Sequence, residues 1–106
     1  MDAGKYGTPT TQWNTLSKAL WVMYVVKEIK AVEDLTVAQI TEVFNKHYKQ
    51  ARVIRSTNVS RDLGKQKVAS PPLVGETPGT PSKWYLTDEG IKTVQNLIIQ
   101  QRNGAN

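Results

Sequence analysis

Cysteine is absent from this chain of 106 residues. Its absence excludes a disulfide framework, a zinc site with thiolate ligands and a cysteine nucleophile, and nothing suggests an oxidising compartment. Histidine occurs once, as His47, so a set of histidine ligands for a metal is missing as well. We therefore predict no metal and no other cofactor. Because no group of residues suited to catalysis stands out, we also predict that the protein is not an enzyme.

Long hydrophobic runs are missing too. The longest apolar run covers only residues 19–26, whereas a membrane-spanning helix needs about 20 residues. The first residues do not resemble a signal peptide. We predict a protein without a membrane partner that stays in the cytoplasm, associated with the nucleoid in a prokaryote or placed in the nucleus of a eukaryote.

Length and composition indicate one small globular domain. The chain is 39% hydrophobic and 22% charged, which is close to the average of folded proteins. We predict a flexible N-terminal arm over residues 1–13, a folded domain over residues 14–100, and a disordered C-terminal tail over residues 101–106.

Acidic residues are scarce in the middle of the chain. The net charge is +5, and residues 46–67 hold seven Lys and Arg residues with Asp62 as the only acid, a local charge of +6. The flanking segments 1–45 and 68–106 carry −1 and 0. Such a segment is either a solvated helix face or a surface for a polyanion. The near absence of local acids favours the polyanion.

Hydrophobic periodicity predicts three helices in the first two thirds of the chain. The first runs from Asn14 or Thr15 to Ala31 and is apolar almost all round, so it is either sandwiched within its own domain or partly buried by a second subunit. The second begins at Thr36 with a capping-box pattern. The third runs from Asn58 or Val59 to Lys67, after a polar cluster suited to capping a helix.

Proline and glycine dominate residues 69–82 and exclude a helix there. Leu73–Thr77 and Lys83–Leu86 are predicted as the arms of a β-hairpin. Alternation on a strand places one of Trp84 and Tyr85 in the core, and we assign Trp84 to it. A last helix begins at Thr87 and frays after Arg102, and its core stripe consists of Ile91, Val94, Leu97 and Ile98.

Three segments resemble the winged helix-turn-helix superfamily. Residues 35–40 (Leu-Thr-Val-Ala-Gln-Ile) are similar to the opening of its second helix, and residues 56–63 (Ser-Thr-Asn-Val-Ser-Arg-Asp-Leu) are similar to many recognition helices. Residues 84–90 (Trp-Tyr-Leu-Thr-Asp-Glu-Gly) resemble the Y-x-L-T-x-x-G pattern that closes the wing in many bacterial and archaeal regulators. The stretch between Tyr48 and Ser56 is longer than the turn of a tight helix-turn-helix. The resemblance implies a mainly α fold with a three-helix core, a proline-rich wing and a C-terminal helix.

This resemblance implies that the protein is a transcription regulator that binds double-stranded DNA sequence-specifically, with its third helix in the major groove. Arg61 is then the best residue for a bidentate contact to guanine, and Asn58 is suited to adenine. The other basic and hydroxyl side chains contact phosphates and fix the orientation. The predicted DNA-binding residues are Lys49, Arg52, Arg55, Ser56, Thr57, Asn58, Ser60, Arg61, Lys65, Lys67 and Lys83.

A homodimer is a further hypothesis, because a single small winged helix buries little surface on DNA. The apolar side chains left over from the helix stripes are its predicted interface: Trp13, Trp21, Tyr24 and Ile99. Two alternatives to DNA remain open. One is a winged-helix module for protein association within a larger assembly, and the other is a winged helix that binds RNA.

Overall fold

α2 (Thr15–Lys30) is the central helix of the protein. The structure is a computed structural model. It describes residues 3–104, with side chains for residues 5–103. The helix begins where the Asn14 side chain accepts a hydrogen bond from the Ser17 amide at 2.8 Å. It ends at Ala31 in the left-handed conformation. Buried residues point from it in every direction, toward α3, α4, α5 and β2. This confirms the prediction that the helix is sandwiched within its own domain, because the other elements of the domain surround it.

Two further helices pack on α2 and on each other, α3 (Val37–His47) and α4 (Ser56–Lys67). The predicted capping box at the start of α3 is confirmed, with Thr36 and Gln39 bonded reciprocally. α4 starts two residues earlier than the earliest predicted start, Asn58, because the Arg55 carbonyl already accepts the Val59 amide at 3.0 Å. No side chain caps it, so the predicted capping role of the polar cluster is wrong. The long connection holds a short 3-10 helix, η1 (Lys49–Ala51).

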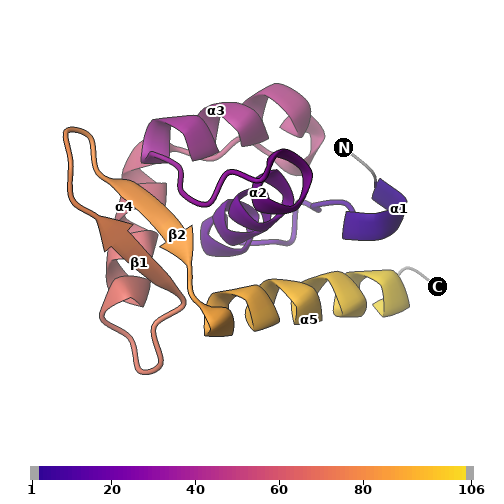
Figure 1. Cartoon of the computed structure of the whole chain (residues 1–106). Helices are drawn as coiled ribbons and strands as arrows, with labels where there is room; N and C mark the ends of the chain where they lie inside the picture. The colour runs from indigo at the N-terminus through magenta and orange to yellow at the C-terminus, as the bar shows by residue number, and fades with distance from the viewer. Residues whose placement is uncertain (1–2, 105–106) are drawn as a thin grey trace.

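β1 (Val74–Thr77) and β2 (Lys83–Leu86) form an antiparallel hairpin, with Val74 opposite Leu86. The predicted arms are thus confirmed within one residue. Trp84 is buried and Tyr85 is exposed, as the alternation of the strand predicts. Leu35 extends the pairing, since its backbone exchanges two hydrogen bonds with that of Trp84, at 2.8 and 2.9 Å. The mainly helical fold with a small hairpin is confirmed (Figure 1).

α5 (Asp88–Gly104) follows the hairpin directly. Thr87 caps it by accepting a hydrogen bond from the Gly90 amide at 3.1 Å, and its own hydroxyl donates to the Pro72 carbonyl at 2.7 Å. A Cβ at Gly90 would collide with the Leu73 carbonyl oxygen. Because the two backbones approach each other this closely, only glycine fits at position 90, three residues after the capping threonine.

Both ends of the chain differ from the sequence prediction. Residues 3–6 form α1 (Ala3–Tyr6), and the Tyr6 side chain is buried against the core. The described part of the predicted arm therefore packs onto the domain. α5 continues through Arg102 to Gly104, into the segment predicted as a disordered tail. Residues 1–2 and 105–106 lie outside the described residues. α1 and the last turns of α5 lie on the side of the molecule away from the hairpin (Figure 1).

Candidate nucleic-acid interface

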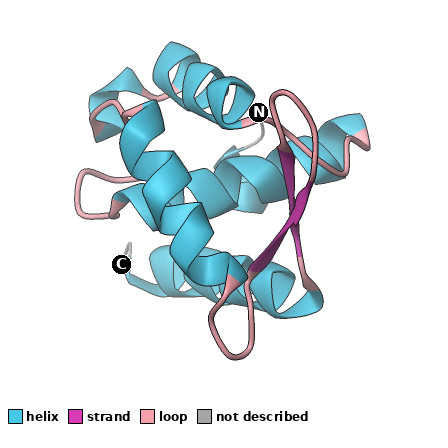
Figure 2. Cartoon of the chain, turned by 90° about the vertical axis from the view of Figure 1, so that its left-hand side faces the viewer, coloured by secondary structure: helices cyan, strands magenta, loops and turns pink. Residues whose placement is uncertain are grey.

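The outer face of α4 carries the candidate site. Val59 and Leu63 are fully buried and fix the inner face of the helix, so the residues about half a turn away point outward. Thr57, Ser60 and Arg61 are exposed on that outer face. Figure 2 shows α4 next to the hairpin on the side of the molecule that faces the viewer, without another element in front of it. The outer face of α4 is therefore not covered by another element of the domain.

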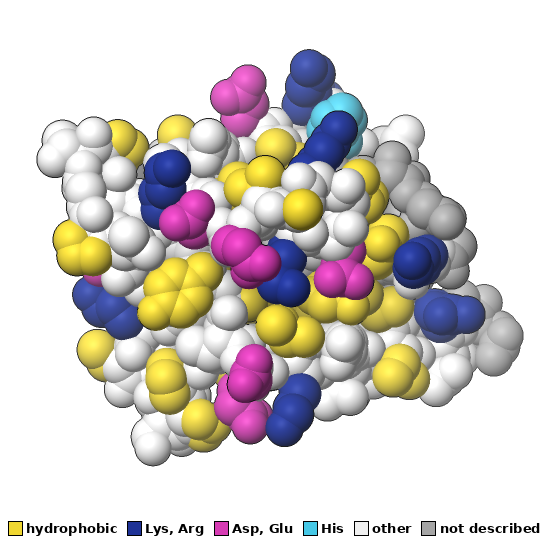
Figure 3. Space-filling view, viewed as in Figure 1, with side chains coloured by type: hydrophobic (Ala, Val, Ile, Leu, Met, Phe, Trp, Pro, Cys, Tyr) yellow, Lys and Arg dark blue, Asp and Glu magenta, His cyan; other side chains and the backbone are white. Residues whose placement is uncertain are grey.

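The basic residues of segment 46–67 remain at the surface. Arg55 at the start of α4 and Lys65 near its end are exposed, and neither forms an ion pair within the described residues. Lys49 and Arg52 are exposed on η1 and directly after it, and Lys83 is exposed on β2. The face drawn in Figure 3 differs, since acidic and basic side chains are intermingled there. Hence the excess positive charge lies on α4 and on the chain that leads into it.

Arg61 keeps donors for a ligand although it has a neighbour of opposite charge. Its Nε–H donates to Oδ1 of Asp62 at 3.2 Å, and its side chain is 57% exposed. In the part of the chain that the structure describes, its terminal amino groups make no hydrogen bond. An ion pair at this exposure contributes little to stability, and it leaves the terminal amino groups of the guanidinium available as donors.

Lys67 differs from the other basic residues predicted to contact DNA, because its charge is neutralised by a side chain of the protein itself. Its Nζ lies 2.8 Å from Oε1 of Glu76 on β1 and 5.8 Å from the centroid of the Trp84 ring. The Ser82 hydroxyl donates to the other oxygen of Glu76 at 2.6 Å. The hydrogen bond from Lys67, followed by that from Ser82, lowers the pKa of Glu76. Lys67 therefore ties the end of α4 to the hairpin.

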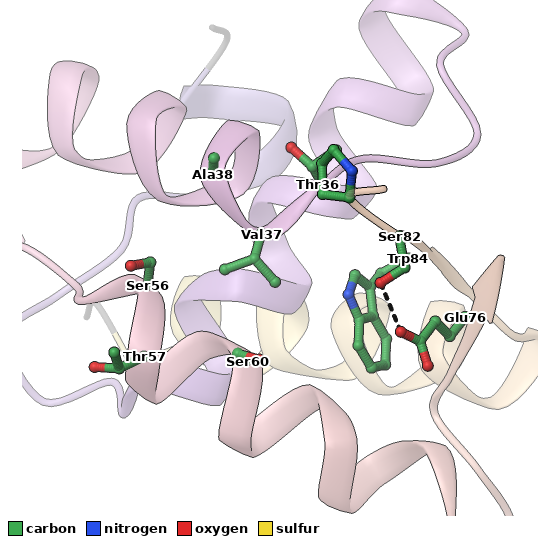
Figure 4. A pocket seen from close by; sticks show the side chains of 10 residues that line it. Thr36, Val37, Ala38, Ser56, Thr57, Ser60, Glu76, Ser82 and Trp84 are labelled. Atoms are coloured by element: carbon green, nitrogen blue, oxygen red, sulfur yellow. Dashed lines mark hydrogen bonds between the residues drawn. The ribbon is translucent and has the colours of Figure 1, made fainter. Parts of the chain in front are cut away.

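A cleft of about 400 Å³ opens between the start of α3, the first turns of α4 and the hairpin. Ser56, Thr57 and Ser60 line it from α4, and Trp84 and Ser82 line it from the hairpin side (Figure 4). Hydroxyl side chains are suited to contact phosphate oxygens. The structure thus brings three of the predicted hydroxyl residues together, while Asn58 lies half-buried at the side of the helix.

Lys18 is a structural residue that the sequence analysis did not single out. It is the only buried charged side chain among the described residues. Its Nζ donates to the carbonyl oxygen of Ala51 and, at 3.2 Å, to that of Arg52. Arg52 has a φ of 71°, which non-glycine residues rarely adopt. Burial, followed by the charge of Arg52, lowers the pKa of Lys18. The sequence carries a signal for this structural role, because Lys18 is a charged residue within a helix that is apolar almost all round.

Replacing Lys18 with methionine, which has a similar length, should loosen the connection that sets the start of α4. The buried carbonyl oxygen of Ala51 and the part-buried one of Arg52 lose their donor, so we expect the free energy of unfolding to fall by about 1–3 kcal/mol. Urea unfolding followed by circular dichroism measures this change. Lys27→Met, on the same helix but at a more accessible position, is the matched control. Equal stability of both variants would contradict the role of Lys18.

The predicted dimer interface is wrong for Trp21. This side chain is 1% exposed, and its indole N–H donates to the Tyr6 carbonyl at 2.8 Å. Trp13 covers it edge-on, with ring centroids 6.3 Å apart. Tyr24 is half-buried and packs against the Tyr6 ring. The N-terminal segment therefore covers the aromatic surface that was assigned to a second subunit, and only Ile99, 53% exposed, stays open.

Comparisons with models of protein families, with curated proteins and with solved structures give no match for this chain. Among residues 3–104, no group of three or more acidic, histidine or cysteine side chains is placed to hold a metal ion. None of the described helices is both long and apolar enough to cross a membrane.

Proposed function

We propose that this protein is a winged helix-turn-helix domain that binds double-stranded DNA, with α4 in the major groove, and acts as a small transcription regulator. The observation that carries the proposal is the uncovered outer face of α4, which combines exposed hydroxyl groups with unneutralised basic side chains. The order of elements supports it, because three packed helices are followed by a hairpin that lies beside the third of them. That is the arrangement in which a recognition helix and a wing face the same duplex.

The residues of the interface divide into two roles in this proposal. Arg61, on the outer face and with its terminal amino groups available, is suited to the two adjacent acceptors of guanine. Arg55 and Lys65 flank it and neutralise phosphates, as do Lys49 and Arg52 on the approach to α4. We assign no adenine contact to Asn58, because that side chain is half-buried.

Binding to an unrelated duplex over a series of salt concentrations tests the proposal. With about four to six phosphates neutralised, the logarithm of the association constant should fall against the logarithm of salt concentration with a slope of about −3.6 to −5.4. Fluorescence anisotropy of a labelled 20-base-pair duplex is the measurement. A lack of binding at low salt, or a response that is flat with salt, would contradict DNA binding.

A second candidate function, protein association, is favoured by a different surface. A cleft of about 380 Å³ between α2 and α3 is lined by Val26, Ile29 and Val43, with Lys30 and His47 among its walls. Ile29 is 43% exposed and Val32 is 39% exposed. Exposed apolar side chains around a cleft are typical of protein interaction sites. A flat salt response in the duplex experiment would favour this function over DNA binding.

A further inference from the structure

Gly64 occupies the interior of α4 although nothing in the domain requires a glycine there. A Cβ added at this position would meet no atom within 4 Å. Its φ is not positive, so the backbone is one that any residue adopts in a helix. Glycine is also the least favourable helix residue apart from proline. The folded chain therefore loses helix stability at Gly64 without a packing or conformational gain inside the domain.

The position of Gly64 on the helix connects it to the candidate interface. It follows Ser60 by four residues and Arg61 by three, so it lies beside both on the outer face. Lys65, exposed and without an ion pair among the described residues, comes directly after it. Gly64 is half-buried between these exposed side chains, so the main chain of α4 is left without a side chain over it at this position. A partner laid along the helix can approach the backbone most closely at this point.

We propose that Gly64 sets how deeply α4 enters the major groove, because the sugar-phosphate strand at the groove wall passes over this glycine while Lys65 contacts its phosphates. This inference rests on the proposed function. It assigns to Gly64 a positioning role, since the residue has no side chain to contact the DNA. A Cβ or a longer side chain would hold the helix away from the strand and lengthen the neighbouring phosphate contacts.

Gly64→Ala and Gly64→Leu separate this role from a structural one. In the free protein, both variants should unfold at a higher temperature than the parent, with a shift of roughly 4 °C for alanine. Binding to a 20-base-pair duplex of mixed sequence in 100 mM salt should weaken about tenfold for alanine and more for leucine. Asn96→Ala is the control, since it also improves a helix on an exposed site but lies on α5.

The outcomes distinguish the inference from the proposed function. If the parent protein binds and both Gly64 variants bind equally well, Gly64 has no positioning role and the inference is overturned, while DNA binding stands. If the parent protein itself does not bind, the proposed function fails. A fall in unfolding temperature for Gly64→Ala would also overturn the inference, because it would show that the fold itself needs the glycine.

Discussion

Replacing Trp21 with alanine is expected to lower the free energy of unfolding by about 3–5 kcal/mol. The side chain is 1% exposed and lies at the centre of an aromatic group, with its ring centroid 6.3 Å from that of Trp13 and 5.0 Å from that of Tyr48. Its removal leaves a cavity and an unpaired Tyr6 carbonyl. A small domain has about 5–15 kcal/mol of stability in total, so the variant should lose much of its resistance to urea.

Trp21→Phe and Ile99→Ser are the comparison variants for this prediction. The phenylalanine keeps most of the ring but loses the hydrogen bond to Tyr6, and we expect a smaller loss, about 1–2 kcal/mol. Ile99 is exposed, so its replacement should change stability by less than about 0.5 kcal/mol. If Trp21→Ala instead unfolds like the parent and changes the mass in sedimentation, the assignment of Trp21 to the core is wrong.

Replacing Arg55, Arg61 and Lys65 together with glutamine is expected to weaken duplex binding by roughly 500-fold in 100 mM salt. Arg55 and Lys65 each neutralise one phosphate, which contributes a factor of about 8 at that concentration, and the lost guanine contact of Arg61 contributes a further factor of about 8, or about 1.2 kcal/mol. All three side chains are exposed, so the folded domain should keep its unfolding temperature. Titration of a labelled duplex by fluorescence anisotropy gives the affinities of variant and parent.

A second triple variant controls for net charge alone. Lys30, Lys92 and Arg102 are also exposed, and their replacement with glutamine removes the same three charges from α2 and α5. We expect this variant to lose less than about tenfold, because charges farther from the duplex act only through the screened field of the protein. Equal losses in the two triple variants would show that no particular face of the molecule binds the DNA.

Local patterns in the sequence predicted most of the fold. The capping box at Thr36 depends on residues three apart, and the stripe of Val59 and Leu63 depends on residues four apart, so both are visible without a structure. The hairpin arms were marked by the proline and glycine between them. The sequence predicts a later start for α4 because Ser56 and Thr57 have side chains suited to capping, whereas in the structure they form the first turn of the helix.

Contacts between distant residues account for what the sequence did not predict. The hydrogen bond between Trp21 and Tyr6 and the bonds from Lys18 to the chain before α4 join positions 15 and more than 30 residues apart. No periodicity within one element reveals such a pairing. The same holds for Lys67, whose charge counts toward the basic segment but is neutralised by Glu76 on the hairpin. The sequence therefore predicts the candidate site as one continuous basic segment. The structure separates the exposed side chains that form no ion pair, such as Arg55 and Lys65, from Lys67, which is paired with Glu76.

The salt dependence of duplex binding, measured side by side for the parent and for the variant lacking Arg55, Arg61 and Lys65, tests the central proposal most directly. If the outer face of α4 contacts the DNA backbone, the slope of the double-logarithmic plot should be smaller in magnitude by about 1.8 in the variant, which corresponds to the two lost phosphate contacts of Arg55 and Lys65. An unchanged slope in a folded variant would contradict the proposal, because the phosphates would then be bound by another surface of the protein.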